Sequence, residues 1–568
     1  MKRRYLLLPV LAVGSASPAV GQDAGSLLRD RQQQADPTLP RPSEETVADP
    51  DAPVEERSDD GTRILVQSLR IEGDPSLLDA DQRAALAARV EGQSVGFEAI
   101  RTLADAANTA LRDNGHLLAQ AVIPPQDATD GVLRLQLLQG SLEAVEIVTS
   151  EQVRARKSIL AGVIEGRIDR SRLDRDGLES ALLRLNDWPG LSARSRLAPG
   201  NAPGTTRLLV DVQQEPALGG VIHGDNFGSP STGREQVHAQ LSLTDLTGHG
   251  DLGVSASEGQ RYFSAALSAP LAAEGMVVGV NYAYLDYENT DPVGELIGLE
   301  GRAHFATVSM QYQAVRSRRS NLRLTGSFNG KVLTDDSAVG RLSDKRIWSG
   351  TLGFSGDVGD DFLGGGVTQL SGGWTLGDLD LSRIPAAEVG DALGLRTQGT
   401  FHRLNADMAR FQRLTDTLSL IVRGSGQWAS KNLDSAESFS LGGPFGVRGW
   451  PVGEGRGDAG AVGTVELRSD FTLGKGATGL QLAAFLDAGW VRLNKDTNGI
   501  PPVNACACNS YSLSSVGLGA TLRHRSITFA ASWAHGIGDN PGRSAFDGTN
   551  VDGGTRRQQF WLSGSVRF

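Results

Sequence analysis

The sequence predicts an α+β amino-terminal part followed by an antiparallel transmembrane β-barrel of about 16 strands, with a short helix ahead of both. Two similar modules with mixed strand and helix periodicity occupy residues 62–140 and 141–215. In residues 216–568, apolar residues recur at every second position. Beyond the first residues, no segment has the roughly 18 apolar residues of a membrane helix, so membrane insertion requires a closed barrel.

Residues 1–21 are typical of a secretory signal peptide. Three basic residues at 2–4 precede an apolar run, and the small residues Ala19 and Gly21 fit a cleavage position before Gln22. We therefore expect the mature chain to be exported.

Residues 22–36 are expected to form a short helix, which we call the plug helix. Leu27 and Leu28 make a small apolar stripe among charged and amide side chains, and Pro37 ends the pattern. Residues 37–61 are rich in proline, aspartate and glutamate, which is typical of a flexible linker.

The two modules repeat at an interval of roughly 75 residues, and each is expected to follow the order strand, helix, helix, strand, strand. Leu133, Leu135 and Leu137 alternate as in a half-buried strand, whereas Leu178 and Leu182 lie four apart as on a helix face. These segments are therefore small soluble domains in series.

The final segment shows the barrel pattern most clearly. Phe560, Leu562 and Val566 suit lipid, whereas Ser563 and Ser565 between them suit water. A soluble β-sandwich also has alternating strands, but the long segments here, separated by tight turns and longer polar loops such as residues 379–399, favour a barrel. A barrel of this size encloses an aqueous channel, which needs a plug.

The loop around residues 442–450 places one arginine, Arg448, among turn-forming glycines. An arginine that enters an enclosed space needs a carboxylate partner. We therefore expect residues 441–459 to fold into the barrel.

This order of segments resembles the outer-membrane transporters of two-partner secretion, which include the haemolysin and filamentous-adhesin exporters of the POTRA-barrel superfamily. Val447-Arg448-Gly449-Trp450 matches the arginine-glycine-aromatic tip of the family's sixth outer loop, with tryptophan in place of the usual tyrosine or phenylalanine. The strand motif at residues 485–489 matches the one that supplies an aspartate partner, Asp487. The resemblance makes the two modules POTRA modules, and Phe568 fits the signal that barrel-assembly machinery reads.

Strand parity independently places Asp487 on the lumenal face, opposite the apolar set that includes Leu482 and Leu486. Our hypothesis is that Arg448 binds Asp487 and holds the loop tip, residues 447–450, as a latch. Glu466, which is also lumenal by parity, is the second candidate partner.

The resemblance implies a function in the outer membrane of a Gram-negative bacterium, with the POTRA modules in the periplasm. They would bind an unfolded exoprotein, such as a large adhesin, haemolysin or toxin, by addition of a strand to a sheet edge. Outer-membrane lipid, barrel-assembly machinery and periplasmic chaperones are further expected partners. The alternatives are an outer-membrane protein insertase of the same superfamily and a passive porin.

Other classes of function find little support. The net charge of -11 and the lack of a basic tract argue against nucleic acid, and no catalytic constellation, cofactor motif or metal-ligand spacing is apparent. Residues 455–460 match a dinucleotide-binding fingerprint but lead into a strand, and we interpret the Arg456-Gly457-Asp458 tripeptide as chance. Cys506 and Cys508 are interpreted as a loop pair that can oxidise.

Overall fold

The computed structural model describes residues 23–33, 47–48, 63–149, 157–169, 173, 175–201, 205–245, 247–271, 275–474 and 478–568. The chain divides into two compact units: Met1–Pro40 with Ala217–Val315 and Arg319–Phe568, and Arg41–Pro216 with Arg316–Arg318. The expected signal peptide and all of the expected linker except Val47 and Ala48 lie outside the described residues.

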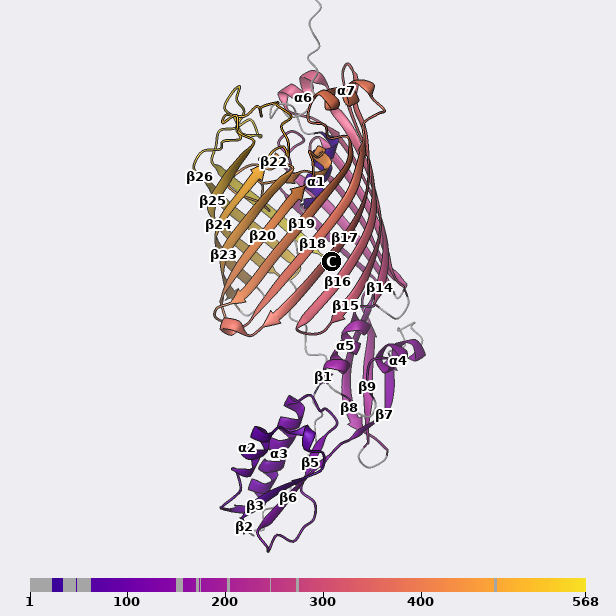
Figure 1. Cartoon of the computed structure of the whole chain (residues 1–568), viewed down its shortest axis with the longest axis vertical. Coiled ribbons are helices and arrows are strands. Elements are labelled where there is room, and N and C mark those ends of the chain that lie inside the picture. The colour runs from indigo at the N-terminus through magenta and orange to yellow at the C-terminus, as the bar shows by residue number, and fades with distance from the viewer. Residues whose placement is uncertain are drawn as a thin grey trace, which may run out of the picture. The chain divides into compact units, whose positions relative to one another are not determined.

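Sixteen antiparallel strands form one closed barrel, which confirms the predicted fold class (Figure 1). The last strand pairs with the first, so that Ser565 lies opposite His223. The strands are β10 (Leu218–Asp225), β11 (Gln236–Asp245), β12 (Gly248–Ala256), β13 (Gln260–Leu271), β14 (Met276–Glu288), β15 (Glu300–Arg316), β16 (Ser320–Ser337), β17 (Gly340–Asp360), β18 (Gly366–Asp380), β19 (Gly399–Arg413), β20 (Leu418–Ala429), β23 (Ala459–Leu473), β24 (Thr478–Arg492), β25 (Ser510–His524), β26 (Ile527–Ile537) and β27 (Gln558–Arg567).

The alternation of side chains along the strands gives the barrel an apolar outside. On β27, Phe560 and Leu562 are 60% and 55% exposed, whereas Trp561 between them is 5% exposed. Lipid would cover the outer set, and the inner set faces the lumen and its contents. Among the described residues, no helix is both long and apolar enough to cross a membrane.

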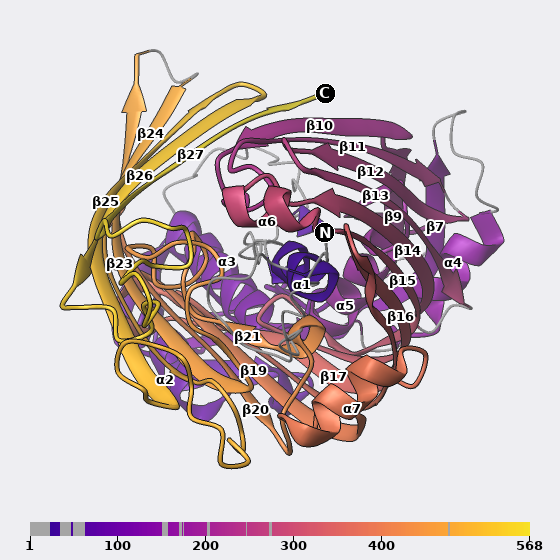
Figure 2. The ribbon, with the colours of Figure 1, turned by 90° about the horizontal axis from the view of Figure 1, so that it is seen from above.

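Helix α1 (Ala24–Gln33) lies inside the barrel (Figures 1 and 2). Figure 2 shows it surrounded by the strands when the barrel is viewed from above. Residues 24–33 of the expected range 22–36 are helical, and residues 22 and 34–36 lie outside the described residues.

The first module of the other unit packs a long amphipathic helix against a sheet. Leu103, Ala107 and Leu111 of α3 are buried, as their spacing predicts. The strands of the sheet follow the order β3-β6-β5, and β2 and β4 form a separate two-stranded sheet. This extra pair differs from the expected order of strand, helix, helix, strand, strand. The elements are β2 (Arg63–Val66), β3 (Ser68–Glu72), the 3₁₀ turn η1 (Pro75–Leu77), α2 (Ala80–Ala87), β4 (Gln93–Gly96), α3 (Phe97–Asp113), β5 (Gln120–Val122) and β6 (Val132–Leu138).

The second module has the expected order strand, helix, helix, strand, strand. Its elements are β7 (Ser141–Thr149), α4 (Lys157–Glu165), α5 (Arg175–Asn186), β8 (Leu191–Pro199) and β9 (Thr205–Gln214). A fourth strand comes from the linker: β1 (Val47–Ala48) lies at the edge of the sheet, whose order is β1-β8-β9-β7. The linker is thus partly built into this module.

Several connections of the barrel have structure of their own. The segment expected as a polar loop, residues 379–399, contains helix α7 (Pro385–Leu393), because proline in the first turn favours the helical backbone. Helix α6 (Pro292–Ile297) lies in another loop, and η2 (Phe362–Gly364) forms a turn between β17 and β18.

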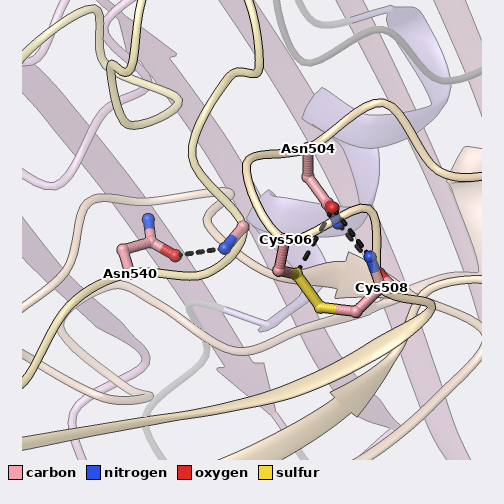
Figure 3. Close-up of a disulfide and its surroundings, with 5 residues drawn as sticks. Asn504, Cys506, Cys508 and Asn540 are labelled. Atoms are coloured by element: carbon pink, nitrogen blue, oxygen red, sulfur yellow. Dashed lines mark hydrogen bonds between the residues drawn. A yellow bond between two sulfur atoms is a disulfide. The ribbon is translucent and has the colours of Figure 1, made fainter.

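Cys506 and Cys508 form a disulfide in the connection between β24 and β25 (Figure 3). The Asn504 side chain supports this turn, because its Oδ1 accepts a hydrogen bond from the backbone N–H of Cys508 at 3.1 Å. The backbone of Ala505 donates to Arg543, so the disulfide turn is joined to the next loop.

Candidate functional site

The connection between β20 and β23 folds into the barrel and carries the predicted latch. It begins after Ala429, earlier than the expected residue 441, and contains η3 (Ser435–Glu437), β21 (Phe439–Ser440) and β22 (Arg456–Gly457). Strands β21 and β22 pair as the stem of a hairpin. The tip is compact, because the N–H of Val447 donates to Leu441 and that of Gly443 donates to Trp450.

Arg448 lies at this tip and binds two carboxylates at once. Its Nε and one terminal nitrogen donate to the two oxygens of Asp487 at 2.9 and 2.8 Å. The other terminal nitrogen donates to Glu466 at 2.7 Å. Both residues that strand parity proposed as partners are therefore in contact with the same guanidinium. Burial would lower the pKa of Arg448, but Asp487 and Glu466 raise it above its ordinary value.

Asp487 is fully buried, and every donor around it comes from a neighbouring element. Besides Arg448, it accepts hydrogen bonds from Thr464 of β23 at 2.9 Å and Ser515 of β25 at 3.0 Å. The backbone N–H of Arg448 donates to it as well. A buried carboxylate is tolerated only when it is paired and hydrogen-bonded in this way.

Phe485, which interrupts the polar lumenal face, supports the same arginine. The guanidinium carbon of Arg448 lies 3.2 Å from the centre of the Phe485 ring. This is a cation–π contact, and it explains why an aromatic residue faces the lumen at this position. Phe485 lies two residues before Asp487, so strand parity predicts that it is lumenal. Parity does not predict its contact with Arg448.

The rest of the latch is closely packed against the wall. A side chain at Gly449 would place its Cβ 2.6 Å from the backbone of Gly536, so only glycine fits. Trp450 is 1% exposed, and its indole N–H donates to the carbonyl of Ser514. Phenylalanine could not make this bond. Trp561 donates in turn to the carbonyl of Arg448, which joins the latch to the last strand.

Apolar contacts complete the attachment of the loop. Val447 is fully buried in a cluster that the loop shares with strands β24 and β25. Its members are Phe439, Leu441, Val447, Trp450, Val491, Tyr511 and Leu513. The latch is thus held by burial as well as by charge.

The plug helix packs its two leucines into a second apolar cluster. Leu27 and Leu28 are 2% and 1% exposed and contact lumenal side chains of the barrel and residues of the inward loop. The other large members are Leu285, Tyr287, Leu333, Ile347, Leu379, Leu381, Phe401 and Leu433. The stripe identified in the sequence is therefore the buried face of the helix.

Polar side chains of the plug helix bind the loop that carries the latch. Asp30 accepts two hydrogen bonds from Arg456 of β22, at 2.7 and 2.9 Å. Arg29 donates to the carbonyl of Ser438, and Asp23 accepts from the hydroxyl of Ser435. Burial raises the pKa of Asp30 more strongly than Arg456 lowers it.

The same helix also binds the barrel wall. Arg31 donates to Gln260, and one of its terminal nitrogens lies 3.3 Å from Nδ1 of His238. The ammonium group of Lys345 donates to the carboxylate of Asp23 at 2.9 Å. The backbone N–H of Ala24 donates to Asp335 at 2.8 Å. The helix is therefore bonded to both the loop and the wall.

A buried ion pair attaches η3 to the wall. Lys331 of β16 donates to Glu437 at 2.8 Å and to the carbonyl of Ala436 at 2.9 Å, and Arg403 binds the second oxygen of Glu437. Burial would raise the pKa of the Glu437 carboxyl, but Lys331 and Arg403 hold it below its usual range. The surface on which α1 rests is thereby positioned.

Arg456 and Asp458, which the sequence analysis assigned to chance, have defined roles. Arg456 binds the plug helix, and Asp458 accepts from the backbone N–H groups of Leu433 and Lys495. Burial raises the pKa of Asp458 to about 7. One feature of the sequence could have suggested these roles: both residues lie on the same loop as the latch, ten or fewer positions after Arg448.

Phe568 lies at the closure of the barrel. Its backbone exchanges two hydrogen bonds with Gly220 of β10, at 2.9 and 3.0 Å, and its side chain is 68% exposed. Within the described ranges, no group of three or more His, Cys, Asp or Glu side chains is arranged to hold a metal ion.

Asp487→Asn should destabilise the assembled barrel by about 3–5 kcal/mol, because it leaves part of the charge of Arg448 unpaired in a buried site. Glu466→Gln should destabilise the barrel less than Asp487→Asn, because Arg448 still binds the carboxylate of Asp487. The measurement is the urea concentration at which the purified protein loses its folded, heat-modifiable band on a gel.

Asp470→Asn is the matched control, because Asp470 lies on the same face of β23 as Glu466 but is exposed, and among the contacts described its side chain bonds only to Gln481. Equal midpoints for the Asp487 and Asp470 variants would contradict the buried-pair argument. Exchange of the two charges by Arg448→Glu with Asp487→Arg would test the pairing less well. The new carboxylate at position 448 would lie beside Glu466 and be repelled by it.

Gly377→Val should loosen the plug helix. Gly377 faces the lumen on β18, and an added Cβ would lie 2.3 Å from the ring of Phe401, which packs in the cluster around Leu27 and Leu28. Overpacking of about 1–3 kcal/mol corresponds to a shift of roughly 5- to 150-fold away from the seated helix. Resting ion conductance in a planar bilayer should rise accordingly.

The control for this experiment is Gly373→Val on the same strand and face, where the nearest atom lies at 3.5 Å. If both valine variants conduct like the wild type, packing around Phe401 does not hold the helix.

Comparison with known proteins agrees with this architecture. Residues 204–522 match the family described as haemolysin secretion/activation protein ShlB/FhaC/HecB, and residues 64–140 match the ShlB-type POTRA domain. The heme/hemopexin transporter protein HuxB of Haemophilus influenzae is 25% identical over 563 residues, which cover 96% of this chain and 95% of that protein. The outer membrane transporter CdiB of Escherichia coli O6:K15:H31 (strain 536 / UPEC) is 24% identical, with 87% and 85% covered.

The fold is also similar to a solved structure. The structure of CdiB from Escherichia coli superposes with a TM-score of 0.61 at 20% identity and covers 91% of this chain and 93% of that one. With the family match spanning more than half of the sequence, the chain belongs to the ShlB/FhaC/HecB family of haemolysin secretion/activation proteins.

Proposed function

We propose that this protein is the outer-membrane transporter of a two-partner secretion pathway and passes a large unfolded exoprotein through its barrel. The observation that carries the proposal is a closed 16-strand barrel whose lumen contains a helix of the same chain, in a member of a secretion family. A channel needs such a helix only if it must be closed at rest and opened for a wide cargo. Members of this family are transporters, and the proposal assigns no catalytic activity.

The names of the relatives support a transport function. One is named as a heme/hemopexin transporter and another as an outer membrane transporter. The resemblance stated above implies that the cargo here is an exoprotein, whether adhesin, haemolysin or toxin.

The lumen beside the plug helix suits a polypeptide without a fixed sequence. A cavity of about 750 Å³ extends from Arg29 and Asp30 to the wall. Its lining is rich in amide, hydroxyl and charged side chains, among them Gln313, Asn321, Asn405, Asp407, Arg423 and Ser425. Such a wall offers hydrogen bonds of both kinds, and apolar side chains such as Ile421, Phe439 and Val462 lie between the polar ones.

In this proposal the latch of residues 447–450 keeps the inward loop in a transport-competent position, and Arg448 with Asp487 and Glu466 is its anchor. The plug helix closes the lumen through Leu27 and Leu28 and leaves when cargo arrives. The POTRA modules bind the exoprotein in the periplasm, Phe568 presents the terminal signal to barrel-assembly machinery, and periplasmic chaperones keep the precursors soluble.

An insertase of the same superfamily is the second candidate, since fold alone does not separate the two. The plug helix favours secretion, because an insertase does not need to close a wide lumen against its own cargo. A passive porin would leave the POTRA modules without a function.

The test of function is co-expression with the exoprotein encoded beside the gene in the same genome. The exoprotein should appear in the medium only when the transporter is present, and total outer-membrane protein content should stay unchanged. Retention of the exoprotein together with loss of other barrel proteins in a deletion strain would instead identify an insertase.

Removal of residues 23–36 should open the channel. The helix occupies the lumen through contacts that no other described segment replaces, so resting conductance should rise while the barrel still assembles. Conductance is measured in planar bilayers and assembly by heat modifiability on gels. Unchanged conductance in an assembled variant would contradict the plug assignment.

A further inference from the structure

The turn between β17 and β18 lies at the periplasmic end of the barrel. The first barrel strand, β10, begins at Leu218, directly after the POTRA modules. Neighbouring strands are antiparallel and β17 is the eighth in the barrel, so it ends where β10 begins. The POTRA modules are periplasmic, so η2 lies at the level of the inner leaflet of the outer membrane.

This turn exposes two large apolar side chains. Phe362 and Leu363 of η2 are 64% and 65% exposed. In the sequence of the other connections at this end, no two large apolar residues stand side by side. The pair therefore distinguishes η2 from the other periplasmic turns.

The backbone holds these side chains in a costly conformation. Leu363 has φ 46° and ψ 43°, in the left-handed region that glycine and asparagine adopt more easily than leucine. Gln412 donates to the carbonyls of Phe362 and Gly365 at 2.6 and 3.1 Å, and Arg413 donates to that of Gly364 at 2.8 Å. Because most of the leucine side chain is exposed, burial within the protein does not offset the cost of its backbone conformation.

The turn is attached to the lipid-facing side of the wall. Asp357 lines the lumenal cavity, so its neighbour Val358, which is 53% exposed, faces outward. In the register Val358 lies opposite Thr368, and Thr368 lies opposite Arg410. Arg410 and Gln412, two positions further along β19, therefore face outward as well. Since Gln412 binds the backbone of η2, the turn continues the outer face of the barrel.

Charged side chains mark the level at which the apolar outer face ends. On that face, Arg410 donates to both oxygens of Asp360 at 2.7 and 2.9 Å. Arg413 is exposed, and Arg319, which is 77% exposed, lies 3.5 Å from Asp361. Arginine can keep its stem along apolar surface while its guanidinium binds a phosphate. The arginines around η2 thus suit the headgroup layer of a membrane.

We propose that η2 is an interfacial anchor, in which Phe362 and Leu363 enter the inner leaflet at the boundary between headgroups and acyl chains. Arg319 and Arg413 lie at the level of the phospholipid phosphates. Phospholipid is favoured over a protein partner because η2 continues a surface that lipid already covers. Transfer of the two side chains from water into lipid offsets the backbone cost at Leu363 and fixes the depth of this part of the barrel rim.

The experiment identifies what contacts η2 in intact cells. Phe362 is replaced by p-benzoyl-phenylalanine, an aromatic photo-cross-linker, in the full-length transporter. After irradiation, the transporter is purified from its folded, heat-modifiable band and digested, and the mass of the peptide that contains position 362 reveals a phospholipid adduct or a cross-linked protein. The matched control carries the same cross-linker at Asp416, an exposed residue in the turn between β19 and β20 at the same end.

Phospholipid adducts at position 362 should exceed those at position 416 roughly tenfold, because transfer of an aromatic side chain out of water shifts its distribution by about that factor. Adding Leu363→Asp should lower the adducts at position 362, since a carboxylate resists transfer into lipid. Aspartate tolerates the left-handed backbone, so this change leaves the conformation of the turn in place.

Three results would overturn the inference. The first is a yield of phospholipid adducts at position 362 no higher than at position 416. The second is cross-linking of position 362 chiefly to protein, whether a POTRA module or a periplasmic chaperone. The third is an undiminished yield of phospholipid adducts in the assembled Leu363→Asp variant.

Discussion

The buried charge of Arg448 is the constraint on which the interior of this barrel depends. A guanidinium removed from water is tolerated only with carboxylates in good geometry, and Asp487 and Glu466 supply them from two adjacent strands. Because both carboxylates belong to the wall, the charge sets where the loop tip lies relative to the strands. Burial of the apolar side chains of Val447 and Trp450 also stabilises the loop. The hydrophobic effect is non-directional, so it does not fix the position of the loop tip as the charge pairs do.

The position of the plug helix follows from that of the loop. Arg456 and the η3 segment, which contact the helix, belong to the same connection as Arg448. A displaced loop would therefore remove both the charge partner of Asp30 and the surface under Gly25, where an added Cβ would lie 2.7 Å from Ser435. The wall contacts of Arg31 and Asp23 would remain, so the helix has two partly independent attachments.

The helix is held by an amount of energy that a binding event can reverse. Two buried leucines contribute about 3–6 kcal/mol together, and the buried ion pairs contribute little net free energy, because the cost of removing their charges from water offsets much of their attraction. A larger apolar face would close the channel permanently. In the proposed function, the mixture of two leucines with Asp23, Arg29, Asp30 and Arg31 lets the helix close the channel reversibly.

Strand alternation, the repeat of the two modules, the plug leucines and the lumenal position of Asp487 and Glu466 could be predicted from the sequence, because they depend on periodicities that local backbone geometry imposes. The sequence did not reveal that both carboxylates bind one arginine, that Phe485 stacks on it, that Arg456 binds Asp30, or that Val47 and Ala48 join the sheet of the second module. Those contacts join residues separated by 18 to 426 positions. Only the closed barrel and the folded sheet bring these residues into contact, because local backbone geometry does not relate positions so far apart in the chain.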